Sequence, residues 1–489
     1  MRRTAFLLPL VLVLGVACST NPVTGNREFN IVSEAQEIQM GRESHQEVIR
    51  QFGVYDEKPE LTRLVETIGR RIAANSDRPN LPWTFTLLDS PIVNAMALPG
   101  GYIYVTRGMV ERINSEDELA GVLGHEIAHV TARHAAQRIS RAQLAQFGML
   151  LGAVVAGPEA AQQYGQIADL ALTLLFQRYS RGQETQADLV GTGYMAESQF
   201  NPIGAERMLM TLQRLGSGED SPVERYFMSH PDPAKRVRDV RGKLNELQKT
   251  TGASWDEPNR PAYVRLLDGI ITGASTESVV IRNNTVYDRA HGLIIPAPAG
   301  WTPVTAPGTV FAMSPRGRGN MSFVAQEIEN RELQGSGVQN AVRNRLQQMG
   351  LQYVGSRQTR IGSGQNLPID AWVGQTQGGQ VGVETTQFPH GDHVAVFMFI
   401  APNLSRSQSP LGEVMSRAAI DPARARAAEP ARMRIGTVRS GESWADLAQR
   451  ATGNRGDAET IAEINGFDLN TRPTANMVVK LPQEILPEM

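Results

Sequence analysis

The sequence predicts a multidomain protein, with a mainly α-helical domain and its small β-sheet first, then an α/β domain, and last a small βααβ domain. The 489 residues exceed one typical hydrophobic core, and a length of this order suggests about three units. Helical periodicity dominates the first 250 residues, whereas β-branched and aromatic runs dominate after residue 262. Two stretches rich in Gly, Ser, Pro, Ala or Arg, at 250–261 and 405–432, separate the three parts.

The segment from His125 to His129 is the most informative part of the helical region. At 3.6 residues per turn, His125 and His129 lie one turn apart on one face, so both rings can reach one metal ion. Glu126 lies about 100° further round, where it can reach a water at the metal without binding the metal itself. Ser115 and Glu118 are expected to form the capping box that starts this helix. The alternative is a helix that carries two incidental histidines.

A second acidic motif supplies the candidate third ligand. A catalytic zinc ion needs three protein ligands and one open position. Glu184 and Asp188 lie one helical turn apart, which suits one metal ligand and one carboxylate that orients a ligating histidine. On its own, such an acidic pair is typical of a solvated helix face, so its meaning depends on the histidine helix upstream.

These motifs occur in the order of a known family, and the matching segments are Asn21-Pro22-Val23-Thr24-Gly25, Val32-Ser33-Glu34, Asn94 to Gly101, His125 to His129, Glu184 to Asp188 and Ser229-His230-Pro231. Over residues 21 to 245 the chain resembles the peptidase M48 family, the CAAX-prenyl-protease-type gluzincins, and most of all its periplasmic lipoprotein branch. The resemblance implies one zinc ion per chain, bound by His125, His129 and Glu184. It also implies that Glu126 is the general base and that Asp188 holds a ligating histidine.

His230 has two interpretations. A histidine between Ser229 and Pro231 is compatible with a plain surface turn or a helix-capping turn. In periplasmic relatives, however, the matching histidine lies on a loop over the active site and can occupy the open zinc position. The resemblance therefore implies either a gate that leaves before substrate enters or a side chain that stabilises the oxyanion.

The segment from Pro91 to Val105 is expected to form the substrate cradle. Tyr102 to Thr106 has the residues of a strand and follows a Pro-Gly-Gly turn. The resemblance implies that substrate backbone adds to an edge strand beside the zinc helix, which marks Asn94, Ala95, Met96 and Ala97 as the substrate strand. The alternative is a structural hairpin packed under the helix. Further on, the apolar run 144–176 predicts a helical hairpin.

The first 18 residues predict a secretory signal peptide with a lipobox. Two arginines precede an apolar run, and Cys18 ends the segment, although Gly15 stands where the lipobox usually has another residue. Cys18 is the only cysteine, so an intramolecular disulfide is impossible and lipidation is the expected role. Ser19 after it resembles proteins sorted to the outer membrane. We therefore expect a periplasm-facing lipoprotein of the bacterial cell envelope, attached to the outer membrane.

Of the remaining regions, the middle domain is expected to be an accessory binding or structural domain without chemistry. The expected bounds are 19–250 for the metallopeptidase domain and 262–404 for this α/β accessory domain, whose opening at His291 to Trp301 resembles PsbP-like domains. Within the accessory domain, strands are expected at 293–295, 309–312, 322–325 and 394–400, and one amphipathic helix at 338–348. Residues 405–432 are expected to be a flexible linker. Residues 433–484 resemble a LysM module, which implies peptidoglycan binding, with a compact cap that has no glycan affinity as the alternative.

Two function classes remain open. The first is a zinc-dependent endopeptidase that acts on misfolded or stalled envelope and outer-membrane proteins. The second is a zinc-latched chaperone or peptidoglycan-tethered scaffold with little proteolysis. The presence of Glu126 favours the enzyme, because a scaffold would not need the base. A net charge of −2 and a pI near 6.5 give no electrostatic reason to expect a nucleic-acid partner.

Overall fold

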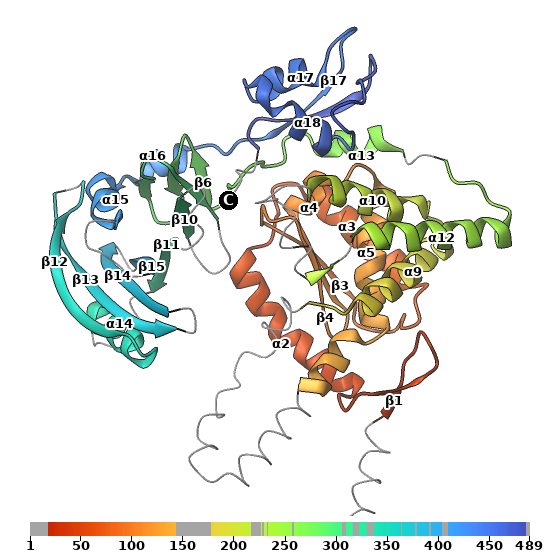
Figure 1. The fold of residues 1–489 in the computed structure, drawn as a ribbon, viewed down its shortest axis with the longest axis horizontal. Helices are drawn as coiled ribbons and strands as arrows, with labels where there is room; N and C mark the ends of the chain where they lie inside the picture. The colour runs from red at the N-terminus through yellow and green to blue at the C-terminus, as the bar shows by residue number, and fades with distance from the viewer. Residues whose placement is uncertain are drawn as a thin grey trace, which may run out of the picture.

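The structure, a computed structural model, consists of three parts, of which the third lies against the first (Figure 1). It describes residues 18–142, 178–216, 226, 229–231, 233–256, 259–305, 310–315, 322–329, 337–362, 364–376, 379–390, 393–402 and 409–485. The expected signal peptide at 1–17 and the expected helical hairpin at 144–176 lie outside these residues. Among the described helices, none combines the length and the apolar character needed to cross a bilayer.

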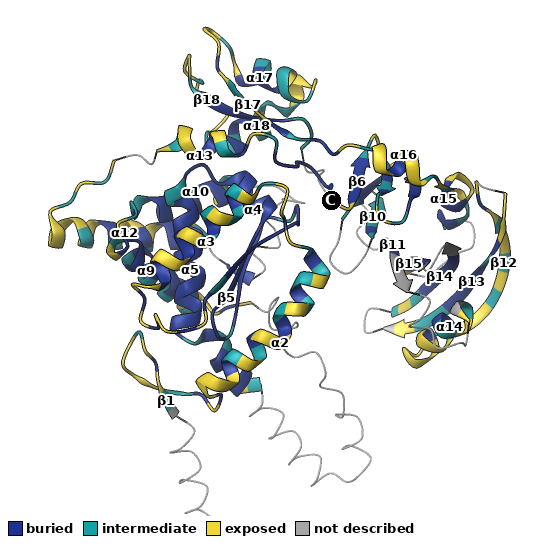
Figure 2. Cartoon of the chain, turned by 180° about the vertical axis from the view of Figure 1, so that it is seen from behind, coloured by how far each residue is buried: buried dark blue, intermediate teal, exposed yellow. Residues whose placement is uncertain are grey.

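The first part, here called the helical domain, surrounds a buried central helix. Its helices are α2 (Glu34–Phe52), α3 (Pro59–Ala73), α4 (Arg107–Arg112), α5 (Glu116–Thr131), α9 (Arg181–Glu197), α10 (Ile203–Leu215) and α12 (Pro233–Thr251). Helix α5 packs against α3, α9 and α10, and its apolar residues belong to the largest hydrophobic cluster. In Figure 2, α5 is buried along its length, whereas α2 shows an exposed stripe.

A small sheet lies beside α5 in the helical domain. Its strands are β3 (Thr84–Leu88), β4 (Ala95–Leu98) and β5 (Tyr102–Thr106), in the order β3-β5-β4. Strand β5 is central, parallel to β3 and antiparallel to β4. Strand β4 is therefore an edge strand, and it contacts α5. A two-stranded ribbon, β1 (Cys18–Thr20) with β2 (Arg27–Phe29), pairs Cys18 with Phe29 near the start of the domain.

The start of α5 differs in one detail from the expected capping box. The Ser115 hydroxyl accepts a hydrogen bond from the Glu118 backbone N–H at 3.0 Å, as expected for an N-cap. The Glu118 carboxylate, however, accepts from the backbone N–H of Asn114 at 3.0 Å and not from that of Ser115. The reciprocal half of the box is therefore displaced by one residue.

Helices α5 and α9 touch through two glycines. A Cβ atom added to Gly191 would meet the backbone carbon of Gly124 at 2.6 Å, and one added to Gly124 would meet the Gly191 oxygen at 3.0 Å. Only residues without a side chain allow such an approach. Because Gly124 directly precedes His125, this contact brings the motif on α5 close to the acidic motif on α9.

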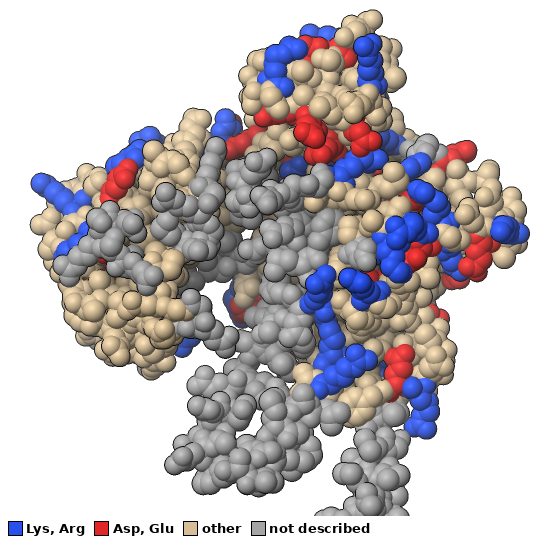
Figure 3. Space-filling view, viewed as in Figure 1, with Lys and Arg blue, Asp and Glu red and all other residues tan. Residues whose placement is uncertain are grey.

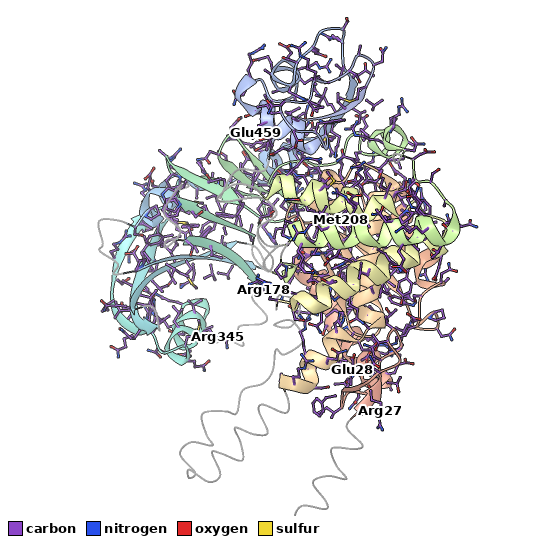
Figure 4. All side chains as sticks on the ribbon, turned by 45° about the vertical axis from the view of Figure 1, so that its right-hand side comes forward. Arg27, Glu28, Arg178, Met208, Arg345 and Glu459 are labelled. Atoms are coloured by element: carbon purple, nitrogen blue, oxygen red, sulfur yellow. The ribbon has the colours of Figure 1, made fainter. Side chains whose placement is uncertain are left out.

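The second part, the accessory domain, is built around antiparallel strands. One sheet has seven strands in the order β12-β13-β14-β15-β11-β10-β9 and another has four in the order β16-β8-β7-β6. The strands are β6 (Val279–Arg282), β7 (Thr285–Asp288), β8 (Leu293–Pro296), β9 (Trp301–Val304), β10 (Phe311–Pro315), β11 (Ser322–Glu329), β12 (Gln352–Arg360), β13 (Asn366–Thr376), β14 (Gly379–His390), β15 (His393–Pro402) and β16 (Ala419–Ile420). The helix expected at 338–348 is confirmed as α14 (Val338–Gln348), and its residue Arg345 is labelled in Figure 4.

The expectation of a flexible linker at 405–432 is wrong for its described part. Residues 409–432 contain two short helices and a strand, α15 (Leu411–Arg417), β16 and α16 (Pro422–Ala427). Three side chains of α15 are buried in the accessory core, namely Leu411, Val414 and Met415. Their i, i+3, i+4 spacing forms an apolar stripe inside a segment otherwise rich in Ala, Arg and Pro.

The third part, the C-terminal module, has the expected βααβ order. It comprises β17 (Met433–Thr437), α17 (Trp444–Ala451), a 3₁₀ turn η2 (Arg455–Asp457), α18 (Ala458–Ile464) and β18 (Val478–Pro482). Its own core includes Trp444, Leu447 and Ile461. Helix α18 lies against α10 of the helical domain, and α13 (Arg260–Leu266) lies against β18 (Figure 1).

One buried arginine ties the helical domain to the accessory domain. Arg107, with no exposed surface, donates to Asp89 at 3.1 Å and to the backbone oxygen of Ile271 at 2.6 Å. It also donates to the backbone oxygen of Ser275, close to the first strand of the accessory domain. Two backbone amides of the helical domain, those of Asp56 and Glu57, donate to Glu277.

Candidate metal centre

Four side chains converge at one buried point between α5, α9 and the segment before α12. The members are His125, His129, Glu184 and His230, and one ligand atom from each lies within 4.8 Å of all the others. The Nε2 atoms of His125 and His129 are 3.0 Å apart, and the Glu184 carboxylate lies 3.3 Å from His129 Nε2. Ligand atoms around a tetrahedral zinc ion lie about 3.3 Å apart when each bond is about 2 Å. The four side chains thus fit one zinc ion.

Glu126 supplies a further test of this fit. Its side chain is 1 % exposed, and among the described residues neither carboxylate oxygen has a hydrogen-bond partner. An unpaired buried carboxylate is costly, and burial raises the pKa of Glu126. Its nearest basic atom is His230 Nε2, 3.8 Å away. The carboxylate beside the ligand cluster is thus left free to bond a water or a substrate group.

Asp188 and Arg236 fix the orientation of His125. Asp188 Oδ1 lies 2.9 Å from His125 Nδ1, so the opposite ring nitrogen faces the other ligand atoms. Arg236 donates to both oxygens of Asp188, at 2.7 and 2.8 Å, and lies 3.0 Å from Glu184. Burial alone would raise the pKa of Asp188, but the Arg236 charge and its hydrogen bonds outweigh this and lower it. Arg236 is itself only 1 % exposed.

His129 has a different orienting partner. Its Nδ1 lies 2.8 Å from His134 Nδ1, and His134 Nε2 lies 3.0 Å from the Gln186 side-chain oxygen. Burial lowers the pKa of His129 well below its usual value and lowers that of His134 to about 4, so both rings are neutral near pH 7. Neutral imidazole is the form that binds a metal. Tyr179 stacks on the His129 ring at 3.8 Å.

The ligand carboxylate is held in its charged form. Burial would raise the pKa of Glu184, but the charges of His230 and Arg236 and hydrogen bonds from His129 and His230 bring it well below its usual value. For His125, burial and the Arg236 charge lower the pKa, whereas Asp188 and Glu184 more than reverse this. The site therefore offers an anionic ligand with its histidines.

His230 lies inside the ligand cluster and not on the surface. Its Nδ1 is 3.1 Å from a Glu184 oxygen and 3.2 Å from His125 Nε2, and the side chain is buried. Tyr226 stacks on its ring at 4.6 Å, and its backbone N–H donates to the Tyr226 oxygen. The plain surface turn that the sequence left open is therefore wrong.

The expected substrate strand lies next to the metal centre. Strand β4 contains Ala95, Met96 and Ala97, and the backbone of Asn94, just before it, pairs with Thr106. Ala97 and Leu98 share the lining of one small cavity with His129 and Tyr179. The Asn94 side-chain oxygen is buried and has no partner among the described residues. An edge strand beside the zinc helix is thus present in the fold.

Four residues at this site were not expected from the sequence. They are His134, Tyr179, Tyr226 and Arg236. The five-residue step from His129 to His134 was a usable signal, because both lie near the end of α5. Arg236 gave none, since it stands among other basic residues at the start of α12. Arg178, beside Tyr179, is exposed and is labelled in Figure 4.

Comparison with known proteins identifies the helical domain. Residues 59–244 match the family model of peptidase family M48. The chain is 30 % identical to the mitochondrial metalloendopeptidase OMA1 of Schizosaccharomyces pombe, over 46 % of this chain and 66 % of that protein. It is 31 % identical to the beta-barrel assembly-enhancing protease of Yersinia pestis, over 41 % of this chain and 42 % of that protein. The chain thus spans between two fifths and two thirds of these relatives.

The chain also has a weak likeness to a solved structure. The solution structure of cyanobacterial PsbP (CyanoP) from Synechocystis sp. PCC 6803 is 14 % identical, covers 30 % of this chain and 95 % of that chain, and has a TM-score of 0.22. The buried ligand cluster and the family match together place this chain in peptidase family M48, with residues 59–244 as its zinc metallopeptidase domain.

Proposed function

We propose that this protein is a zinc-dependent endopeptidase of the bacterial cell envelope that cleaves misfolded or stalled envelope and outer-membrane proteins. The observation that carries the proposal is the unpartnered Glu126 carboxylate beside the four potential ligands. The substrate class is supported by similarity to relatives named beta-barrel assembly-enhancing protease in Yersinia pestis and Escherichia coli.

Each residue of the site has a separate role in the proposed hydrolysis of a peptide bond. His125, His129 and Glu184 would hold a zinc ion, which would supply Lewis acidity that acidifies water and polarises a carbonyl. Glu126 takes the proton of the attacking water and delivers it to the leaving nitrogen. Asp188 keeps the proton of His125 on Nδ1, so that Nε2 stays available to the metal. The edge of β4 aligns the substrate backbone by strand addition.

A chelator provides the first test of this proposal. Unfolded porin and casein should be cleaved by the purified full chain, and a chelator should abolish the cleavage because zinc holds the Lewis-acid role. Re-addition of zinc should restore the activity, as measured by gel-based cleavage assays. Cleavage that survives removal of zinc, verified by metal analysis, would contradict the proposal.

The position of His230 favours an enzyme whose open zinc position is filled at rest. A catalytic zinc site keeps one position open, yet His230 Nδ1 lies among the other ligand atoms. We propose that His230 fills this position at rest and leaves before substrate enters. The same observation supports the second candidate, a zinc-latched chaperone or scaffold with little proteolysis. In such a chaperone or scaffold, the Glu126 carboxylate would have no role as a general base.

Replacement of His230 by Ala separates the gate from the oxyanion role. If His230 blocks the open position, H230A should raise the rate of peptide cleavage about tenfold or more, because no side chain has to be displaced. The rate constant kcat on a short peptide is the measurement. A fall in kcat with zinc content retained would instead assign His230 to oxyanion stabilisation.

Two attachments of the chain extend the proposal. Cys18 is the proposed lipidation site, which would hold the helical domain at a membrane on its β1 end (Figure 1). The C-terminal module is proposed to bind peptidoglycan, on the strength of its LysM-like motifs and βααβ order. Together they would place the protease between the outer membrane and the cell wall.

A further inference from the structure

Lys480 of the C-terminal module has a fully buried side chain. Its side chain has no exposed surface, and its Nζ donates to the backbone oxygens of Glu111 at 2.9 Å, Arg112 at 3.1 Å and Ile113 at 3.0 Å. These carbonyls lie at the end of α4, where a helix leaves carbonyl groups without partners of its own. A strand of the module thus satisfies the end of a helix in the peptidase domain.

The backbone of Lys480 is itself held in place. The Asn465 side chain accepts from the Lys480 N–H at 2.8 Å and donates to its carbonyl oxygen at 2.9 Å. Arg260 of α13 donates to the Asn465 side chain at 2.8 Å and to the Val478 oxygen at 2.6 Å. Because Asn465 is also fully buried, Lys480 reaches α4 from a fixed support.

The segment that Lys480 caps leads directly into the zinc helix. Ile113 is followed by Asn114, whose N–H bonds to Glu118 in the first turn of α5. A Cβ atom added to Gly466 of the module would meet the side-chain nitrogen Nδ2 of Asn114 at 3.1 Å, so the module also touches this junction. Burial lowers the pKa of Lys480, and the Glu118 carboxylate favours the charged ammonium. The module and α5 are thus coupled by contact and by charge.

Charged side chains also lie at the edge of the contact between the C-terminal module and the helical domain. Arg214 of α10 pairs with Asp468 of the module at 3.0 Å. Figure 3 shows acidic side chains along the lower edge of the module and basic side chains just below it, and Figure 4 labels Glu459 in the module and Met208 in α10. Exposed pairs of this kind add little stability, so the buried Lys480 contact matters more than this ion pair.

We propose that Lys480 is a positioning residue for the zinc helix, and that the C-terminal module is a clamp that fixes where α5 begins. Helix α5 carries His125 and His129, and their reach toward Glu184 on α9 depends on the position of its axis. The clamp holds the α4–α5 junction from one end, while the Gly124–Gly191 contact holds the helix further along. This inference rests on the proposed function of the site as a zinc peptidase.

The test is Lys480→Met in the full chain, because Met keeps most of the side-chain volume and removes the three donors. Arg434→Met is the matched control, since Arg434 is exposed on β17 directly opposite Leu481. In K480M, amide hydrogen exchange in residues 107–118 should accelerate about tenfold or more, because the carbonyls at the helix end lose their partners. R434M should match the unmodified chain.

Two functional measurements accompany the exchange experiment. In K480M, zinc affinity measured by chelator competition should weaken about fivefold, and kcat should fall about tenfold with KM within about twofold, as expected for lost positioning. Zinc affinity remains informative if the chain cleaves no substrate, so failure of the proposed function is distinguishable. Faster exchange with unchanged zinc affinity and kcat would overturn the proposal, because it would leave only a structural cap.

A milder variant covers the case in which K480M does not fold. Arg260→Met loosens the support of Lys480 but leaves its three bonds to α4. It should give a smaller acceleration of exchange at 107–118 and a smaller loss of zinc affinity, in the same direction. If R260M folds and changes neither quantity while the module remains docked, the clamp is refuted.

Discussion

Replacement of Glu126 by Gln is expected to abolish proteolysis while zinc binding and folding stay intact. Glutamine keeps the size of the side chain but cannot accept the proton of the attacking water, and general-base catalysis contributes about 10²- to 10⁴-fold. Glu126 should not be needed to bind the metal, because the proposed ligands are His125, His129 and Glu184, and Glu126 is not among the four residues that converge as possible ligands. Cleavage of unfolded porin, metal analysis and thermal unfolding are the three measurements.

The matched control for this variant is Glu116→Gln on the same helix. Glu116 lies in the first turn of α5, is only partly buried and is remote from the ligand cluster. E116Q should keep its activity and lose a few tenths of a kcal/mol of stability through the helix dipole. E126Q with undiminished cleavage would refute the role of Glu126, and E126Q without zinc would make the residue part of the metal's support.

Replacement of Arg236 by Met is expected to destabilise the folded protein by about 3–5 kcal/mol, because it leaves Asp188 as an uncompensated buried charge. The charge of Arg236, together with its two hydrogen bonds, lowers the pKa of Asp188 below its usual value although burial would raise it. Urea unfolding of the zinc-loaded protein gives the measurement. Zinc affinity should fall as well, because Asp188 orients His125.

The control for this variant is Arg238→Met on the same helix. Arg238 is exposed, so its loss should change the free energy of unfolding by less than about 0.5 kcal/mol. The double variant R236M/D188N should recover part of the loss, because no buried charge remains unpaired. If the free energy of unfolding changed by less than about 1 kcal/mol in R236M alone, the buried Arg236–Asp188 ion pair would not stabilise the fold.

The sequence predicts those parts of the metal centre whose residues lie one helical turn apart. His125 and His129 share one helix, and Glu184 and Asp188 share another, so each pair followed from the helical repeat. That the two helices meet was expected only through the family resemblance. The hydrogen bonds from Arg236 to Asp188 and the contact between His134 and His129 depend on how α12 and the end of α5 are placed in three dimensions. No local spacing in the sequence predicts that placement.

The fold was predicted best where a pattern was long and regular. The helix at 338–348 has the expected bounds, and strands occur near the positions expected for them in the accessory domain. Residues 409–432 were misjudged, because their Ala- and Arg-rich composition conceals the apolar stripe of α15. The role of Lys480 had no signal in the sequence, since a lone lysine in a β-strand is usually solvated.

The glycine contact between α5 and α9 restricts how the proposed active site can open to substrate. Helices in backbone contact cannot move closer together, and separating them would break the metal's coordination. If His230 fills the open zinc position as proposed, admission of a polypeptide needs displacement of His230, while the contact between α5 and α9 stays in place. The proposed gate would then be one small moving part against a fixed pair of helices.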